Sequence, residues 1–282
     1  MNASKKMGIL IPGYNVSRTI RDVIGRFSEK TLTSVDEVVF IDNCSTDDTF
    51  DVVRAIQGEN TTLGTKLTVI RNGANHGLGG SLKIGLDNMR TRGFSHFMII
   101  HSDKQGDSEE IATNFLTFHR DNPEVDFVMA SRFTKSADVQ GYSTLRTLGN
   151  YFFNILTFLL TGHRMSDSGC GIVLVRTDML NQVPFQNLSN SFFFNPMLNI
   201  LLHGENTVNI REIPLRWKDP EVGSNLKVVK YVTGLTQLLL AYQWHRLTKG
   251  IGFPPTPENP GPDALAHEVF SSRSSSSRGQ LR

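Results

Sequence analysis

The sequence predicts an α/β fold in which a mostly parallel central sheet is flanked by helices. Short apolar runs and amphipathic helical patterns alternate four times in the first part of the chain, which is the arrangement of parallel strands joined by crossover helices. The apolar runs are uninterrupted, as expected of strands that are buried on both faces. Each run also ends in polar or glycine-rich residues, so the carboxyl ends of the strands should form one crevice, where open α/β sheets bind ligands.

The four repeating units account for the amino-terminal half. Strands are expected at residues 7–11, 35–41, 66–70 and 97–100, where the chain is apolar over the length of a buried strand. Helices are expected after them, at about 17–27, 49–57, 78–89 and 111–118. The turns between these elements carry most of the candidate binding residues.

The carboxyl-terminal half is less regular. Strands are expected at residues 125–130, 172–175 and 207–217, and helices from Thr144 through the apolar segment 151–160 and at 194–203. The chain is divided into a main domain at residues 1–225, an amphipathic or apolar C-terminal helix at 226–250 and a tail at 251–282. The tail is expected to be disordered, because its proline, serine and arginine residues cannot form a core.

Composition excludes some classes of function. A net charge of +2 over 282 residues gives no strong attraction to nucleic acid. Cys44 and Cys170 have neither metal-ligand spacing nor a disulfide framework, and free thiols fit a reducing cytosol. The first residues lead directly into a strand, with no room for a signal peptide. We therefore expect a cytoplasmic protein, or one that lies peripherally on the cytoplasmic face of a membrane.

Two apolar segments leave contact with a membrane open. No segment reaches the roughly 20 apolar residues of a membrane span. Residues 151–160 are too short, and residues 228–247 are interrupted by polar and charged side chains. Either segment could form a helix that lies in the membrane interface. The alternative for both is a helix that packs on the core of the domain itself.

The strongest candidate for chemistry is Asp103, in a polar cluster that follows the apolar run 97–100. A carboxylate in this place could bind a divalent cation, and the cation could neutralise a diphosphate. The alternative is a strand that ends in a solvated turn. His101 is either a polar residue at the strand end or a further metal ligand.

Other strand ends offer groups for a nucleotide. Asp42 could accept a hydrogen bond from the ring N–H of uracil or guanine, or it could cap the next helix, a role for which Asp47 and Asp48 are better placed. Gly77 and Gly79 precede a helix N-terminus, where backbone N–H groups suit a phosphate. Their spacing matches neither the P-loop nor the dinucleotide fingerprint, which argues against a nicotinamide dehydrogenase.

Two charged residues in the second half are further candidates. Arg132 follows the fifth strand and could hold a phosphate with its planar guanidinium, or pair with Asp103 or Asp107. Asp167 lies in a turn rich in serine and glycine. It could be a general base for an incoming hydroxyl, or a turn residue without a function in catalysis.

Seven short segments together carry a resemblance to a known family. In order they are residues 11–15, 41–49, 75–79, 102–105, 130–132, 167–171 and 212–214. Their order resembles that of the family 2 glycosyltransferases and, within that family, of the dolichol- or polyprenyl-phosphate sugar transferases. The resemblance covers roughly residues 7–230, and the order of the segments is more specific than any one of them.

The resemblance implies a GT-A fold, a nucleoside-diphosphate sugar donor and inversion at the anomeric carbon. The residues it marks for donor binding are Pro12, Tyr14, Asn15, Asp42, Asn75, Gly77, Gly79, Ser102 and Asp103. Those it marks for Mg²⁺ or Mn²⁺ are Asp103, Gln105 and His101. By the same resemblance, Asp103 acts in catalysis through the metal, Arg132 assists at a phosphate, and Asp167 lies near the acceptor.

The sequence departs from the family pattern in several places. His101 stands where the D-x-D signature usually has its first acid, which puts the strength or the preference of metal binding in doubt. Val16 stands where glutamate is common. Val173 and Pro220 replace arginines of the lipid-phosphate subfamily. The last two departures weaken the case for a lipid-phosphate acceptor, but they do not affect the residues that the resemblance marks for donor binding.

The sequence therefore predicts an inverting glycosyltransferase that uses a UDP- or GDP-sugar. Its acceptor would be a polyprenyl phosphate, or a lipid-linked or glycan acceptor whose hydroxyl would need Asp167 as its base. The alternative is a nucleotide-sugar-binding protein without turnover, in which His101 in place of the usual acid has abolished activity. A nucleotidyltransferase is a further alternative, but the glycine-rich basic loop that it would need after the first strand is not in the sequence.

Overall fold

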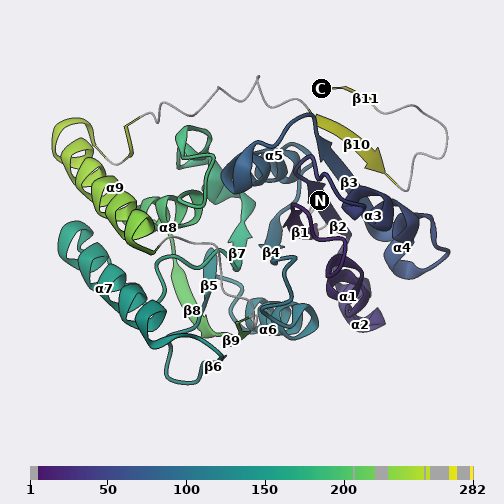
Figure 1. The fold of residues 1–282 in the computed structure, drawn as a ribbon, viewed down its shortest axis with the longest axis horizontal. Coiled ribbons are helices and arrows are strands. Elements are labelled where there is room, and N and C mark those ends of the chain that lie inside the picture. The colour runs from purple at the N-terminus through teal and green to yellow at the C-terminus, as the bar shows by residue number, and fades with distance from the viewer. Residues whose placement is uncertain are drawn as a thin grey trace.

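The computed structural model describes residues 6–205, 207–219, 228–250, 252–254, 267–271 and 280–281. Its centre is a mixed sheet in which a parallel block confirms the predicted α/β class (Figure 1). The parallel block is formed by β3 (Leu67–Asn72), β2 (Glu37–Asp42), β1 (Met7–Gly13) and β4 (His96–Ile99). All residues of β1 and β2 are buried, which explains why their sequences are almost continuously apolar.

The order of the strands places a crevice in the middle of the sheet. Along the sheet the described strands run β11-β10-β3-β2-β1-β4-β7-β5-β8, so the chain winds outward from β1 to β3 and then returns to the other side of β1 with β4. Open α/β sheets bind ligands at such a reversal, beyond the carboxyl ends of the strands. The residues that follow β1 and β4 therefore occupy the position where a ligand site is expected.

The second half of the sheet is mixed. β7 (Val173–Arg176) pairs antiparallel with both β4 and β5 (Phe127–Ser131), and β5 pairs in parallel with β8 (Ile210–Pro214). The strand predicted at 207–217 is interrupted by the buried Leu215. After it, β9 (Arg216–Lys218) leaves the large sheet and pairs with β6 (Asp138–Gln140) in a small second sheet.

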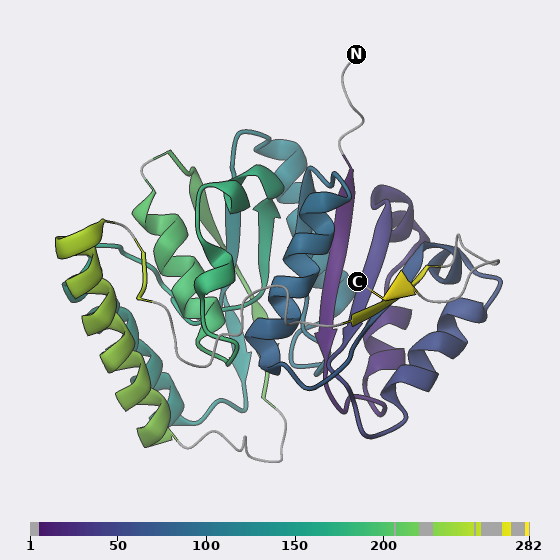
Figure 2. The same ribbon diagram turned by 90° about the horizontal axis from the view of Figure 1, so that it is seen from above.

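Helices cover both faces of the sheet (Figures 1 and 2). In Figure 1, α5 (Gly77–Thr91) and α8 (Phe194–Gly204) lie above it, and α1 (Ile20–Gly25) and α6 (Ser108–Asp121) lie below it. The remaining elements are short or peripheral: α2 (Glu29–Ser34), α3 (Thr49–Gly58), α4 (Thr62–Lys66), and the 3-10 turns Thr177–Asn181 and Phe185–Asn187. The apolar core is continuous through these layers.

Two long helices stand at one end of the molecule. α7 (Thr144–Thr161) and α9 (Val228–Lys249) lie side by side there (Figures 1 and 2). Ser143 caps α7 by accepting a hydrogen bond from the backbone N–H of Arg146, and Gly162 ends it with a φ of 78°, a conformation that favours glycine. Within the described ranges, no helix combines the length and apolarity needed to cross a bilayer.

The prediction of a wholly disordered tail was wrong for residues 267–271. They form β10 (His267–Ser271), which pairs antiparallel with β3 at the edge of the large sheet and is followed by β11 (Gln280–Leu281). The Gln57 amide donates to the carbonyl of Phe270 at 2.9 Å, and the rings of Phe270 and Phe50 meet edge to face. The segment covers the edge strand, whose backbone groups would otherwise lack partners.

Candidate active site

A cavity of about 680 Å³ opens beyond the carboxyl ends of β1 and β4. Nine of the residues predicted from the sequence line it: Pro12, Tyr14, Asn75, Gly77, His101, Ser102, Asp103, Gln105 and Arg132. Four do not line it, namely Asn15, Asp42, Gly79 and Asp167. The cavity has the volume of sites that bind small ligands and cofactors.

The loop after β4 holds Asp103 at the cavity. Ser102 Oγ donates to the carbonyl of Pro12 at 2.8 Å, which joins the ends of β1 and β4. Thr19 Oγ1 donates to the carbonyl of Ser102, also at 2.8 Å. Asp103 is exposed, and its Oδ1 accepts a hydrogen bond from the backbone N–H of Gln105 at 3.1 Å. The fold therefore presents this carboxylate to a ligand on a braced loop.

His101 lies beside Asp103 and is half-buried. Burial lowers the pKa of its imidazole; the carboxylate of Asp103 opposes this shift, and the cation of Arg132 adds to it. The ring is therefore neutral at pH 7 and retains a lone pair that can bind a metal. The rings of Trp217 and His101 are nearly perpendicular, with 6.2 Å between their centroids.

Arg146, which was not predicted, lines this wall of the cavity, and Asp219, also not predicted, connects it to Gln105. Asp219 accepts a hydrogen bond from the Gln105 amide at 2.9 Å and forms an ion pair with the guanidinium of Arg146. Arg146 is in the first turn of α7 and lines the cavity. Both residues come from segments without a motif, so no local pattern marks them. Pro220, which replaces an arginine of the lipid-phosphate subfamily, lies outside the described residues.

The structure places Asp167, the predicted general base, behind Arg132 and not on the cavity wall. Asp167 is fully buried, and its carboxylate accepts from Arg132 Nε at 2.7 Å and from Arg132 Nη2 at 2.8 Å. Burial lowers the pKa of Arg132, but the charge and hydrogen bonds of Asp167 outweigh it and raise the pKa above its ordinary value. Asp167 therefore fixes Arg132 at the cavity, and its own carboxylate does not line the cavity.

The backbone N–H groups of Gly77 and Gly79, which were predicted to bind a phosphate at the start of α5, have partners within the chain. The carbonyl of Asn190 accepts from the N–H of Gly79 at 2.8 Å and from that of Gly80 at 3.3 Å, so the chain itself caps this helix. A Cβ on Gly79 would lie 2.2 Å from the carbonyl oxygen of Ser189. These glycines allow another loop to approach the helix, which is a packing requirement.

Asp42 does not reach the cavity either. It is fully buried below the loop, where its Oδ1 accepts from the backbone N–H of Ser45 at 3.2 Å and its Oδ2 lies 3.6 Å from Arg71 Nε. Burial raises the pKa of its carboxyl, while Ser45 and Arg71 oppose the shift. The next residue, Asn43, lines the cavity instead, and its amide donates to Asn75 Oδ1 at 2.9 Å.

Asn15 supports the same loop from outside the cavity. Its backbone N–H donates to Ser45 Oγ at 3.0 Å, and its side-chain oxygen accepts from the backbone N–H of Thr46 at 2.9 Å. Its φ of 54° is a left-handed conformation that asparagine tolerates. Asn15 therefore shapes the turn that presents Tyr14.

The donor groups here fit a divalent cation only in part. Among the residues that the structure describes, no group of three His, Cys, Asp or Glu side chains is close enough to hold a metal. The cavity wall offers one carboxylate, from Asp103, together with the Gln105 amide oxygen and the His101 ring. Mg²⁺ in enzymes is often held by one or two carboxylates and completed by substrate phosphates and water. The residues fit a cation that binds together with a diphosphate.

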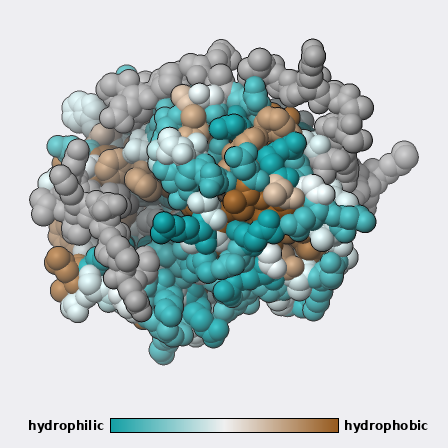
Figure 3. Space-filling model, turned by 45° about the vertical axis from the view of Figure 1, so that its right-hand side comes forward, coloured by the Kyte–Doolittle hydropathy of each residue, from teal (hydrophilic) through white to brown (hydrophobic). Residues whose placement is uncertain are grey.

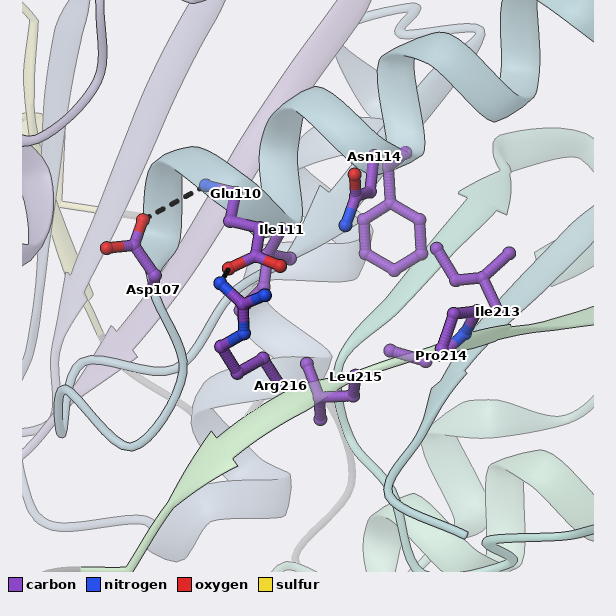
Figure 4. A pocket seen from close by; sticks show the side chains of 10 residues that line it. Asp107, Glu110, Ile111, Asn114, Ile213, Pro214, Leu215 and Arg216 are labelled. Carbon is purple, nitrogen blue, oxygen red and sulfur yellow. Dashed lines mark hydrogen bonds and ion pairs between the residues drawn. The ribbon is translucent and has the colours of Figure 1, made fainter. Parts of the chain in front are cut away.

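A second hollow, between α6 and the strands β8 and β9, is too small for such a ligand (Figure 4). Its volume is about 10 Å³, which is room for at most a water molecule. The ion pair between Arg216 Nη1 and Glu110 Oε2, at 3.1 Å, lies across it.

The fold and the large cavity together are those of an α/β protein that binds a nucleotide at the carboxyl edge of its sheet. The chain belongs to glycosyl transferase family 2, whose family model matches residues 8–183. It is therefore a glycosyltransferase of the GT-A fold, as the sequence resemblance implied.

Individual relatives add detail about other proteins. Over 229 residues the chain is 22% identical to UDP-N-acetylglucosamine–dolichyl-phosphate N-acetylglucosaminyltransferase of Methanococcus voltae, covering 76% of this chain and 86% of the relative. Among solved structures it is similar to glucosyl-3-phosphoglycerate synthase from Mycobacterium tuberculosis with phosphoglyceric acid bound. The TM-score is 0.60 at 15% identity, over 89% of this chain and 81% of the other.

The same enzyme has also been crystallised with a donor nucleotide and a metal. Its complex with Mn²⁺, UDP and glucosyl-3-phosphoglycerate matches with a TM-score of 0.57 at 15% identity. This match covers 89% of the present chain and 81% of that one. Its complex with Mg²⁺ and UDP matches with a TM-score of 0.58. At this level of identity the likeness concerns the fold.

Proposed function

We propose that this glycosyltransferase moves a sugar from a UDP- or GDP-sugar to the phosphate of a polyprenyl phosphate, with inversion at the anomeric carbon. The observation that carries the proposal is that Arg132 and Arg146 line the same cavity as Asp103. Two guanidinium groups suit an anionic acceptor beside an anionic donor, because each can hold phosphate oxygens with paired N–H groups. The relative that acts on dolichyl phosphate supports the same acceptor class.

The buried Asp167 favours a phosphate acceptor over a hydroxyl. A hydroxyl of a glycan or a lipid-linked sugar needs a base, and the proposed base is engaged by Arg132 on both oxygens. A phosphate is already anionic at neutral pH, so one of its oxygens can attack without proton transfer. The new bond joins that oxygen to the anomeric carbon, while the bond from the anomeric carbon to the diphosphate breaks and the nucleoside diphosphate leaves.

The donor is proposed to lie along the ends of β1, β2 and β4. Pro12 and Tyr14 would contact the nucleoside, with Asn43 and Asn75 offering amides to its polar edges. Asp42, buried beneath this layer, would hold the loop in place through the N–H of Ser45, and Ser102 would brace the turn after β1. The nucleobase remains open between uracil and guanine, since neither the amides nor Asp42 selects one of them.

A divalent cation, Mg²⁺ or Mn²⁺, is proposed as the cofactor. Asp103 would be its main ligand, with the Gln105 amide oxygen and His101 as neutral ligands. When bound, such a cation supplies Lewis acidity that stabilises charge on the departing diphosphate. The Mn²⁺ and Mg²⁺ complexes of the structurally similar synthase support this choice. Asp219 would orient the Gln105 amide by accepting from its nitrogen, which leaves the oxygen for the cation.

The proposed setting is the cytoplasm, with peripheral contact at the cytoplasmic face of a membrane. An enzyme of this kind receives its donor from water and its acceptor from a lipid phase, so it must meet both. The interruption of the apolar segment 228–247 by polar residues fits a helix lying in an interface better than one crossing the bilayer.

Titration with UDP and with GDP, each with and without Mn²⁺, tests the donor site. We expect metal-dependent binding of one nucleotide to the wild-type protein and loss of the metal dependence in Asp103→Asn. The competing function is an inert nucleotide-sugar binder. Metal-dependent binding without turnover, for every UDP- and GDP-sugar offered with a short-chain prenyl phosphate, would favour the inert binder.

A further inference from the structure

Helices α7 and α9 carry nearly all of the large apolar side chains that reach the surface of the described residues. Among the residues whose exposure the structure describes, every exposed large apolar residue lies on one of these helices, except Tyr14 and Phe192, which line the cavity. The face that Figure 3 shows is mostly hydrophilic, with apolar residues in small patches. The concentration on one helix pair is therefore a property of this end of the molecule and needs an explanation.

On α7 the exposed apolar residues form a stripe along the whole helix. They are Leu145, Leu148, Tyr151, Phe152, Ile155, Phe158 and Leu159. Their spacing of three and four residues places them on one side, opposite the buried Phe153, Thr157 and Thr161, which face the protein. Over its 18 residues the helix is about 27 Å long, so the stripe is too extensive for a local packing defect.

On α9 the exposed apolar residues are Leu240, Trp244 and Leu247, and the buried ones are Leu235, Leu239 and Tyr242. The two helices run in the same direction, because Arg246 Nη1 near the end of α9 donates to the carbonyl of Thr161 at the end of α7. Trp244 is 72% exposed. A tryptophan in this position is typical of the boundary between water and lipid.

The charges of this helix pair all have one sign. Neither helix contains an aspartate or a glutamate, and the charged residues whose side chains the structure describes are Arg146, Arg246 and Lys249. Arg164, just after α7, is another exposed cation. The chain as a whole is nearly balanced, at +2, so these two helices lack the acidic residues that are common elsewhere in the sequence.

We propose that α7 and α9 together form a docking surface for an anionic lipid bilayer, with their exposed apolar residues in the interface and their cations at the headgroups. Apolar side chains that enter the acyl boundary and basic residues that meet anionic headgroups are the two contributions to interfacial binding. A second copy of the chain is a poorer occupant. In a two-fold symmetric dimer, the basic surface of one copy would face the same basic surface of the other. Neither helix carries an acidic residue that could pair with these cations.

The surface also continues into the active site, and this part of the inference rests on the proposed function. Arg146 belongs to α7 and lines the cavity. A bilayer held against α7 would therefore place lipid headgroups next to the arginine that is proposed to receive the acceptor phosphate. The acceptor could enter the cavity while its hydrocarbon chain stays in the membrane.

Sedimentation of the full chain with vesicles tests the docking surface without donor or acceptor. Vesicles of phosphatidylcholine alone are compared with vesicles that also contain phosphatidylglycerol. We expect binding to the anionic vesicles, reduced by salt.

We also expect a blue shift of tryptophan emission that Trp244→Phe removes, since the other tryptophan, Trp217, is buried. Lys249→Glu should lower the partition coefficient at least about fivefold, whereas Lys30→Glu, an exposed reversal on α2, should not change it.

The triple variant Phe152→Gln, Ile155→Gln, Leu159→Gln should abolish vesicle binding and keep the wild-type melting temperature, because all three residues are exposed. The inference is overturned if the wild-type chain stays in the supernatant with anionic vesicles. It is also overturned if Lys30→Glu and Lys249→Glu weaken binding equally, or if the triple variant only dissociates a dimer. Transfer to a water-soluble short-chain prenyl phosphate should be unchanged in the triple variant. If the wild-type protein shows no such transfer, the proposed function is contradicted, but the inference of a docking surface is not affected.

Discussion

Arg132 and Asp167 form a two-point ion pair, with Nε to Oδ2 at 2.7 Å and Nη2 to Oδ1 at 2.8 Å. The backbone N–H of Arg132 adds a third hydrogen bond to Oδ2 at 3.0 Å. The carboxylate is buried, while the guanidinium reaches the wall of the cavity. From this geometry we infer that Asp167 holds Arg132 in position and that Arg132 contacts the bound ligand.

Asp167→Asn should destabilise the fold, because it leaves the cation of Arg132 without its counter-charge. Removing one partner of a buried pair costs on the order of 3 kcal/mol, which urea unfolding can measure. Asp121→Asn, at an exposed pair with the neighbouring Arg120, is the control and should change stability by less than about 0.5 kcal/mol. Unchanged stability in Asp167→Asn together with a collapse of kcat would indicate a general base instead.

Arg146→Ala should raise the KM for a prenyl phosphate acceptor by about 10- to 100-fold, the worth of a hydrogen bond to a charged group. The affinity for the donor nucleotide should change much less, since Arg146 is connected to Gln105, a proposed ligand of the cation, only through Asp219. The control is Arg216→Ala, which removes an exposed arginine that pairs with Glu110. Equal acceptor KM values for the two variants would exclude Arg146 from the acceptor site.

Gly79→Ala should destabilise the protein by about 1–3 kcal/mol, because its Cβ would meet the Ser189 carbonyl at 2.2 Å. Gly149→Ala is a matched control inside α7, where a Cβ meets nothing within 4 Å. It should stabilise the protein by about 0.5–1 kcal/mol through helix propensity. Thermal melts of both variants, with and without nucleotide, check this. A Gly79→Ala protein of normal stability that has lost nucleotide binding would restore the phosphate role.

Acid should destabilise the protein through His203. Burial lowers the pKa of this histidine to about 4; the hydrogen bond with the Asn199 carbonyl opposes the shift, and His163 adds to it. The unfolded chain then binds a proton near pH 6.5, before the folded chain does. Stability is therefore full above about pH 6.5 and falls between pH 6.5 and 4, by on the order of 3 kcal/mol.

His203→Gln removes this titration. Its melting temperature should vary less than that of the wild type over the same pH window. Parallel curves for the two proteins would show that His203 does not carry the effect.

The sequence was enough to predict the strand ends but not the direction of each side chain. The apolar runs gave β1 to β4 in order, and the polar residues after them do surround the cavity, as Tyr14, Asn75 and Asp103 show. Asp42 does not line the cavity, because adjacent residues at a strand end face opposite ways, and Asn43 lies on the cavity side instead. A pattern of residue types does not show which of two adjacent residues faces the cavity and which faces the core.

The other differences arise from contacts between distant segments. Asn190 reaches the start of α5 and takes the N–H groups of Gly79 and Gly80, and no local signal marks that approach. Arg146 and Asp219 come together from separate parts of the chain. β10 has few apolar residues, and its pairing with β3 comes from backbone hydrogen bonds that any sequence can form.

The central claim is the transfer of a sugar to a prenyl phosphate, and one assay tests it directly. Radiolabelled UDP- and GDP-sugars are incubated with the protein, Mn²⁺ and a short-chain prenyl phosphate, and the label in the organic phase is counted. We predict lipid-phase label from one donor, abolished by Asp103→Asn and by omission of the acceptor. Label that stays in water as free sugar, or that appears equally with Asp103→Asn, would contradict the proposed function.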